Sequence, residues 1–160
     1  MSKEKSIKTN AMRIAEKNNI DIKVINYDCE SFLDGVSIAE KLSQPVESTF
    51  KTLVTQGKSR EFFVCVIPVA DELDLKKAAK AAGEKSLEML HVKDLLKTTG
   101  YVRGGCSPIG MKKQFKTVIH ESALNFDKIM FSGGRLGSQM VMAPSDLAKL
   151  TGASFADITV

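Results

Sequence analysis

The stretch Gly100-Tyr-Val-Arg-Gly-Gly-Cys-Ser-Pro-Ile-Gly-Met111 is the most distinctive part of this chain. Its four glycines permit positive φ angles and let another group approach the backbone closely, while Pro108 keeps Ser107 out of the helical region. The composition therefore predicts a loop with exposed backbone N–H groups, able to hold a carbonyl oxygen or a phosphate. A plain surface turn between two strands is the alternative that composition leaves open.

A β-hairpin is predicted upstream of this loop. Residues 49–55 have strand composition, residues 56–59 supply a turn, and residues 61–67 form an almost continuous apolar strand. The second strand is apolar on both faces, which places it inside a sheet. Lys51 lies in the middle of the first strand, where a charge must either reach water or serve a purpose. Both a functional lysine and an edge-strand lysine that blocks sheet pairing remain open at this point.

The other segments alternate irregularly between helical and strand patterns. Helices are predicted over 6–18, over 37–42 with Ser37 and Glu40 as a capping box, over 74–82 and over 143–150, with a helical turn at 92–97. Further strands are predicted over 22–27, 87–90, 117–120, 127–131, 138–142 and 155–160, with a second glycine-rich turn at 132–137. No repeat or linker divides the chain, so residues 1–160 are expected to form one α+β domain with a mixed sheet or barrel and outer helices.

Composition narrows the classes of function. The 160 residues carry a net charge of +4, which weakly favours an anionic partner such as nucleic acid. The chain has three cysteines without a CxxC pair, which argues against a disulfide framework and against a zinc site. No apolar run is long enough to span a bilayer, and residues 1–8 do not read as a secretory signal. A cytoplasmic protein without membrane attachment is the expectation.

The sequence offers no evident protein nucleophile. The GxSxG, HExxH, P-loop and dinucleotide signatures are absent. His91 and His120 lie in separate elements without an acidic partner, which favours ordinary surface or core histidines over a general base. Cys106 lies near Arg103 in the glycine loop, but no base partner accompanies it. The residues suit a polar pocket that orients an activated substrate, which then carries out its own chemistry.

Five stretches of the chain carry a resemblance to a known family: Phe50–Val54, Phe63–Pro68, Tyr101–Gly110, Phe131–Arg135 and Ala143–Leu147. Their order and spacing are similar to those of the YbaK/EbsC family in the prolyl-tRNA editing superfamily. The resemblance covers about residues 9–150, and it lies nearer the branch that deacylates Cys-tRNA(Pro) than the branch that removes alanine.

This resemblance implies a barrel-like mixed β-sheet wrapped by helices, and trans-editing of cysteine wrongly attached to tRNA(Pro), with Cys-tRNA(Cys) as a further candidate substrate. The substrate thiol is expected to attack its own ester and release the tRNA as a thiolactone forms. Aminoacylated tRNA(Pro) and prolyl-tRNA synthetase are the implied partners, and no cofactor or metal is implied. A non-catalytic module that binds tRNA or the synthetase, and an Ala-tRNA(Pro) deacylase, are the alternatives.

The resemblance also implies roles for individual residues. Lys51 matches the family lysine and Gly104–Pro108 matches the family loop, so Lys51, Gly104 and Gly105 are the expected catalytic residues. Gln139 is the nearest candidate for the polar residue that some members carry after the second glycine turn, and it is not included in the predicted site. The expected substrate-binding residues are Tyr27, Thr52, Arg103, Cys106, Ser107, Pro108, Ser132 and Gly133.

Overall fold

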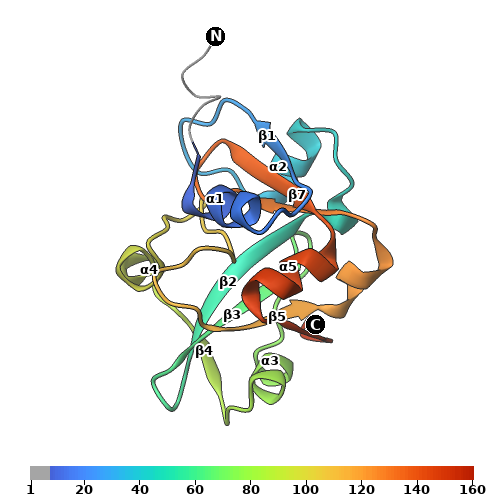
Figure 1. The fold of residues 1–160 in the computed structure, drawn as a ribbon. Helices are drawn as coiled ribbons and strands as arrows, with labels where there is room; N and C mark the ends of the chain where they lie inside the picture. The colour runs from blue at the N-terminus through green and yellow to red at the C-terminus, as the bar shows by residue number, and fades with distance from the viewer. Residues whose placement is uncertain (1–7) are drawn as a thin grey trace.

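The computed structural model describes residues 8–160, so the predicted start of the first helix, at residues 6 and 7, lies outside the described residues. None of the helices within this range has the length and apolar character needed to cross a membrane. Figure 1 shows helices and strands interleaved along the chain. They are α1 (Asn10–Lys17), β1 (Lys23–Asn26), α2 (Gly35–Lys41), η2 (Val46–Ser48), β2 (Phe50–Gly57), β3 (Phe62–Pro68), α3 (Leu75–Ala82), β4 (Leu87–Met89), α4 (Val92–Thr99), β5 (Lys116–His120), η3 (Glu121–Asn125), β6 (Ile129–Ser132), β7 (Ser138–Met142), α5 (Pro144–Thr151) and β8 (Ser154–Ala156).

The larger sheet has five strands in the order β4-β2-β3-β5-β8. β2 and β3 form the predicted antiparallel hairpin, in which Phe50 pairs with Pro68 and Gln56 with Phe62. β3 pairs with β5 in parallel on its other side, so the sheet is mixed. The apolar strand β3 thus lies inside the sheet, as predicted, because side chains on both of its faces can pack against other elements.

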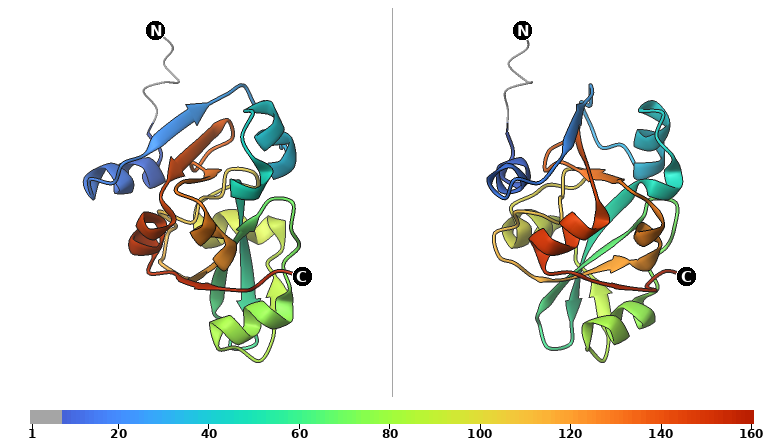
Figure 2. Two further views of the ribbon diagram at one scale, coloured as in Figure 1. Left: turned by 90° about the vertical axis from the view of Figure 1, so that its right-hand side faces the viewer. Right: turned by 45° about the vertical axis from the view of Figure 1, so that its right-hand side comes forward.

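A smaller sheet joins β1, β7 and β6 in that order, with both pairs antiparallel. An isolated parallel bridge between Thr49 and Met130 brings the start of β2 beside β6. Figures 1 and 2 show α1 beside the smaller sheet, with α3 at the far end of the molecule near β4. The predicted α+β class with a mixed sheet is therefore confirmed, and its strands divide into two sheets.

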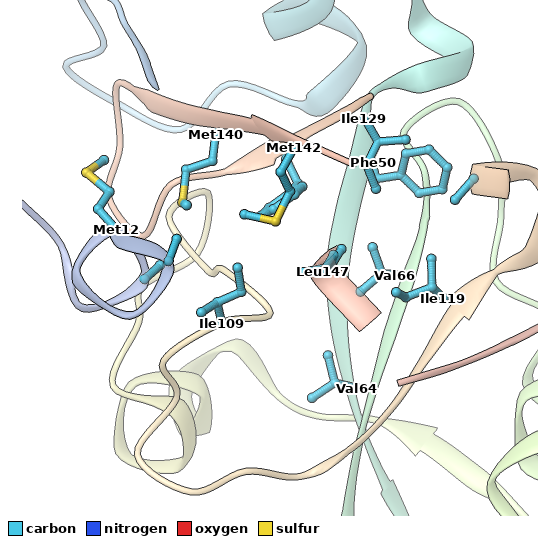
Figure 3. Packing of buried hydrophobic residues seen from close by; sticks show 14 residues of the cluster. Met12, Phe50, Val64, Val66, Ile109, Ile119, Ile129, Met140, Met142 and Leu147 are labelled. Carbon is cyan, nitrogen blue, oxygen red and sulfur yellow. The ribbon is translucent and has the colours of Figure 1, made fainter. Parts of the chain in front are cut away.

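One apolar core lies between the two sheets and holds them together. Figure 3 shows Met12 of α1, Met140 and Met142 of β7, and Phe50 of β2 among the buried side chains of this core. Phe131 of β6 is completely buried in the same cluster. Burying a side chain of this size stabilises the fold by roughly 1.5–3 kcal/mol, so the core fixes the end of β2 that carries Lys51 against β6.

Several of the predicted boundaries are wrong. The first helix begins at Asn10 with Thr9 as its N-cap, and the last strand ends at Ala156, not at residue 160. The second helix begins at Gly35 with Asp34 as its N-cap, and Asp34 Oδ1 accepts a hydrogen bond of 2.8 Å from the Ser37 N–H. Ser37 is thus inside the first turn and does not cap the helix. The predicted helical turn at 92–97 is a full helix that continues to Thr99 and ends at Gly100, whose φ is +87°.

Candidate active site

A cavity of about 480 Å³ lies at the start of β2, between the two glycine-rich loops and the segment that leads into α2. Its walls come from segments far apart in the sequence, which the contact between β2 and β6 brings together. Several predicted site residues line it: Lys51, Thr52, Arg103, Gly104, Cys106 and Ser132.

β2 contributes the cation and a hydroxyl group. Lys51 is half-buried on this wall, and no acidic partner within 4 Å is found for it in residues 8–160. The neighbouring Thr52 Oγ1 is buried, and it too has no hydrogen-bond partner in the described part of the chain. β4 pairs only with Thr55–Gly57, so the start of β2 is left uncovered for the cavity. An unpaired ammonium beside an unpaired hydroxyl is what a polar ligand requires.

The two glycine-rich loops pack directly on each other. Gly104 has φ +83°, and a Cβ placed there would lie 2.8 Å from Leu136 Cδ2 of the second loop. A Cβ placed at Gly105 would lie 3.0 Å from the backbone of Arg135. Glycine is favoured at position 104 by its positive φ angle, and at position 105 because a Cβ would press on the backbone of the other loop.

The backbone N–H groups of the first loop have different partners. The Gly105 N–H donates a hydrogen bond of 2.9 Å to the Val102 carbonyl. For the N–H groups of Gly104, Cys106 and Ser107, no acceptor is found within residues 8–160. Of these three residues, Gly104 and Cys106 line the cavity. Their N–H groups are the candidates to bind an oxyanion there, and Gly105 would contribute by shaping the loop.

Other predicted residues do not line the cavity. Ser107 is fully buried, and its Oγ accepts a hydrogen bond of 3.3 Å from the Ile109 N–H. Pro108 is buried in the same loop. The Gly133 N–H donates to the Ser138 carbonyl at 2.9 Å, closing the second turn. Tyr27 does not line the cavity but contacts a residue that does: its hydroxyl accepts a hydrogen bond of 3.3 Å from Gln139 Nε2.

The structure adds residues that were not in the predicted site. Gln139 lines the cavity and is 4% exposed, and it connects the wall to Tyr27, whose pKa is raised by burial. Phe32 and Asp34 also line the cavity, just before α2. The backbone hydrogen bond from Ser37 holds the pKa of Asp34 below its ordinary value. The sequence signals for this wall were only the isolated aromatic residue Phe32 and, after it, Asp34, a residue type that commonly caps helices.

The one thiol of the cavity is a poor nucleophile. Burial raises the pKa of Cys106 to about 12, so it stays protonated at neutral pH. No histidine lines the cavity; His120 lies elsewhere, and its Nδ1 accepts a hydrogen bond from the Ile158 N–H. Within residues 8–160, no group of three or more His, Cys, Asp or Glu side chains is placed to bind a metal. The cavity supplies a cation, hydroxyls and backbone donors.

Comparisons with known proteins identify the family of the chain. Residues 34–150 match the model of the aminoacyl-tRNA editing domain. The chain is 49% identical over 161 aligned positions to an Enterococcus faecalis protein named as a Cys-tRNA(Pro)/Cys-tRNA(Cys) deacylase, EbsC, covering 99% of this chain and 98% of that one. It is also 27% identical over 97 positions to a proline–tRNA ligase of Thermosipho africanus, covering 61% of this chain and 17% of the ligase.

Solved structures support the same fold. A protein described as a trans-editing enzyme for prolyl-tRNA synthetase superposes with a TM-score of 0.82 at 22% identity, covering 96% of this chain and 99% of the other. A hypothetical protein superposes with a TM-score of 0.85 at 20% identity, covering 95% and 100%. From the domain match and the full-length relative, the chain belongs to the family of aminoacyl-tRNA editing domains.

Proposed function

We propose that this protein is a trans-editing deacylase that removes cysteine from mischarged tRNA(Pro), with residues 1–160 acting as one editing domain. The observation that carries the proposal is the composition of the cavity. It offers Lys51 and free loop N–H groups to an ester, while its only thiol stays protonated. The relative at 49% identity, named for the same activity, supports the proposal independently.

Such an enzyme is needed because proline and cysteine are too similar in size for a synthetase to distinguish them well. Proline and cysteine are similar in volume, and a difference of one small group is worth only ~1–3 kcal/mol in a binding pocket. A synthetase pocket built for proline therefore admits cysteine, and a second site must recognise what proline lacks. That feature is the thiol.

In the proposed reaction, the thiolate of the attached cysteine attacks its own ester carbonyl carbon. A C–S bond forms and the carbonyl becomes an oxyanion, bound by the N–H of Gly104 or Cys106. The carbonyl then re-forms, the bond to the ribose oxygen breaks, and that oxygen takes a proton from solvent, which received the thiol proton, as the tRNA leaves. The cysteine leaves as a thiolactone, which water opens afterwards. Catalysis here is mainly positioning, because the reacting atoms belong to one molecule.

The surrounding residues have supporting roles in this proposal. Lys51 stabilises the developing charge or binds the terminal ribose. Ser132, and Gln139 backed by Tyr27, orient the substrate amino group or ribose. The other predicted residues hold the walls in place: Gly105, Ser107, Pro108 and Gly133 through the loops, and Cys106 as an apolar surface. Since few aromatic residues are available to read the tRNA body, prolyl-tRNA synthetase in the cytoplasm is the proposed partner that selects the tRNA.

The test is turnover on tRNA(Pro) charged with cysteine, serine, alanine or proline, using protein at well below the concentration of tRNA. Many tRNA molecules deacylated per protein, fastest with cysteine, is the expected result. A stoichiometric complex without turnover would instead identify a binding module. Faster release of alanine than of cysteine would make the protein an Ala-tRNA(Pro) deacylase.

A further inference from the structure

Arg103 and Phe32 stack on each other at the opening of the cavity. The guanidinium carbon of Arg103 lies 4.1 Å from the centroid of the Phe32 ring. Both side chains line the cavity, yet Phe32 is 45% exposed and Arg103 is exposed as well. The pair therefore lies where the cavity meets solvent.

The stack is fixed by its neighbours. The Phe32 ring lies beside Gly104, close enough that a Cβ on that glycine would be 3.0 Å from Phe32 Cδ1. Arg103 directly precedes Gly104, so the loop that carries the candidate oxyanion donors also sets the position of the guanidinium. The ring holds one face of the guanidinium and leaves its N–H edge free to bind a ligand.

The guanidinium has no anionic partner in the protein. Within residues 8–160, no ion pair or hydrogen bond of its side chain is found. Asp34 is an acidic residue of the cavity wall, and its two carboxylate oxygens already accept hydrogen bonds from the Ser37 N–H and hydroxyl. An oriented, unpaired guanidinium at the opening is suited to an anion with paired oxygens, such as a phosphate.

We propose that Arg103 binds the phosphate that joins the terminal nucleotide of the aminoacyl-tRNA to the preceding one, with Phe32 holding the guanidinium in place. This inference rests on the proposed function. When the ester lies beside Gly104 and Lys51, the ribose that carries it extends toward the opening, and its 5′-phosphate is one ribose ring away. Lys51 is less exposed than Arg103 and is left for the ester or the ribose. Arg103 is thus a substrate-binding residue that sets the depth of the ester.

Two small substrates isolate this contact: 3′-O-cysteinyl-adenosine, and the same ester carrying a 5′-phosphate. The unmodified protein is expected to favour the phosphorylated ester by about tenfold in kcat/KM, as for one charge-assisted hydrogen bond at a partly exposed site. Arg103→Gln is expected to reduce this preference to about twofold or less. Phe32→Leu retains an apolar group beside Gly104 but removes the ring, so it should give an intermediate preference.

Arg60→Gln is the matched control, because it removes the same charge at the β2–β3 turn, outside the cavity. It should keep the tenfold preference. Thermal unfolding of each variant checks that the protein remains folded. A second readout is the salt dependence of KM for Cys-tRNA(Pro): the loss of one phosphate contact should lower the slope by about 0.7 on logarithmic axes.

The outcomes separate this inference from the proposed function. Cleavage of neither ester nor Cys-tRNA(Pro) would overturn the proposed function, and with it the role of Arg103. Cleavage of both esters at equal rates would leave the function standing and reject the phosphate contact. Equal inhibition of both esters by inorganic phosphate, without a preference between them, would show a site for free anions and would also reject the contact.

Discussion

Gly105 lies directly against the backbone of Arg135, and a methyl group added to this glycine would stand 3.0 Å from the Arg135 Cα and carbonyl carbon. A backbone segment cannot relieve a close contact by rotating, as a flexible side chain can, so Gly105→Ala must move the two loops apart by a few tenths of an ångström. Because the proposed catalysis depends on positioning, we expect kcat/KM for Cys-tRNA(Pro) to fall by about tenfold. Rates of deacylation in excess substrate measure this directly.

Gly152→Ala is the control for that substitution. Gly152 ends α5 with φ +70°, and nothing lies within 4 Å of a Cβ placed there. The strained φ should lower the free energy of unfolding by about 1 kcal/mol, while the activity of the folded protein stays unchanged. Equal losses of activity in the two variants would indicate general destabilisation and not separation of the loops.

Lys51 is the residue on which the proposed mechanism depends most. Lys51→Met keeps the length of the side chain and removes its charge from the cavity, so we expect deacylation to fall by about 100-fold or more. Lys58→Met, at the exposed turn of the same hairpin, removes an equal charge outside the cavity and should retain full rates. Full activity in Lys51→Met, with the thermal unfolding curve unchanged, would exclude Lys51 from catalysis.

The attacking group in the proposed reaction belongs to the substrate, so its titration should set the pH dependence. A free thiol has a pKa near ~8.5, and the enzymatic rate on Cys-tRNA(Pro) should rise about tenfold per pH unit below that value. The uncatalysed rate is measured in parallel and subtracted. Ser-tRNA(Pro), which lacks the thiol, should be a poor substrate at every pH. Comparable rates for serine and cysteine would rule out the substrate thiol as nucleophile.

The sequence predicted the local parts of this site better than their assembly. The hairpin follows from strand composition on both sides of a short turn within one segment, and the structure confirms the pairing. The α2 cap was misassigned because Asp34 and Ser37 are both favoured capping residues, and Glu40 three positions after Ser37 completes a capping pattern. Only the tertiary fold decides between them.

Contacts between distant segments could not be read from the sequence. The stack of Arg103 on Phe32 joins the glycine loop to the segment before α2, and no periodic pattern links these two segments. The bond from the Gly105 N–H to the Val102 carbonyl likewise depends on φ and ψ angles that glycine leaves open. Residue types indicated a polar pocket, and tertiary packing determined which groups line it.

The buried thiols give a prediction that needs no tRNA. Burial raises the pKa of Cys65 and of Cys106 to about 12, so at pH 8 iodoacetamide should modify the more exposed Cys29 in the folded protein and spare the other two. Unfolded protein, the control, should react at all three.

Cys106→Ser should retain most of the deacylase activity, whereas loss of activity together with a trapped acyl-enzyme would point to Cys106 as nucleophile.

The same pKa shifts set the direction of an effect on stability. A thiol whose pKa is raised in the folded state adds stability that is complete below its unfolded pKa of ~8.5. That stability is lost as the pH rises toward the folded value of about 12. The free energy of unfolding in urea should therefore decrease above about pH 8.5, and less steeply in Cys106→Ser. An identical decrease in the variant would show that the Cys106 thiol is not protected from ionisation.

Thr52 and Thr55 lie on the same strand but differ in hydrogen bonding. Substituting each in turn therefore distinguishes a hydroxyl that binds substrate from one that stabilises the fold. The Thr55 hydroxyl donates a hydrogen bond of 3.1 Å to the Phe63 carbonyl, whereas the buried Thr52 hydroxyl has no partner among residues 8–160. Valine has nearly the same shape as threonine. Thr55→Val should therefore lower the free energy of unfolding by about 1 kcal/mol and leave activity intact.

Thr52→Val should have the opposite effects. Removing an unpaired buried hydroxyl relieves its desolvation cost, so the free energy of unfolding should rise by about 1 kcal/mol. Activity should fall several-fold, because the substrate loses the group that this hydroxyl is placed to bind. Urea unfolding and kcat/KM on Cys-tRNA(Pro) measure the two effects separately. If Thr52→Val loses stability as Thr55→Val does, the Thr52 hydroxyl is already hydrogen-bonded in the free protein and is not available to bind the substrate.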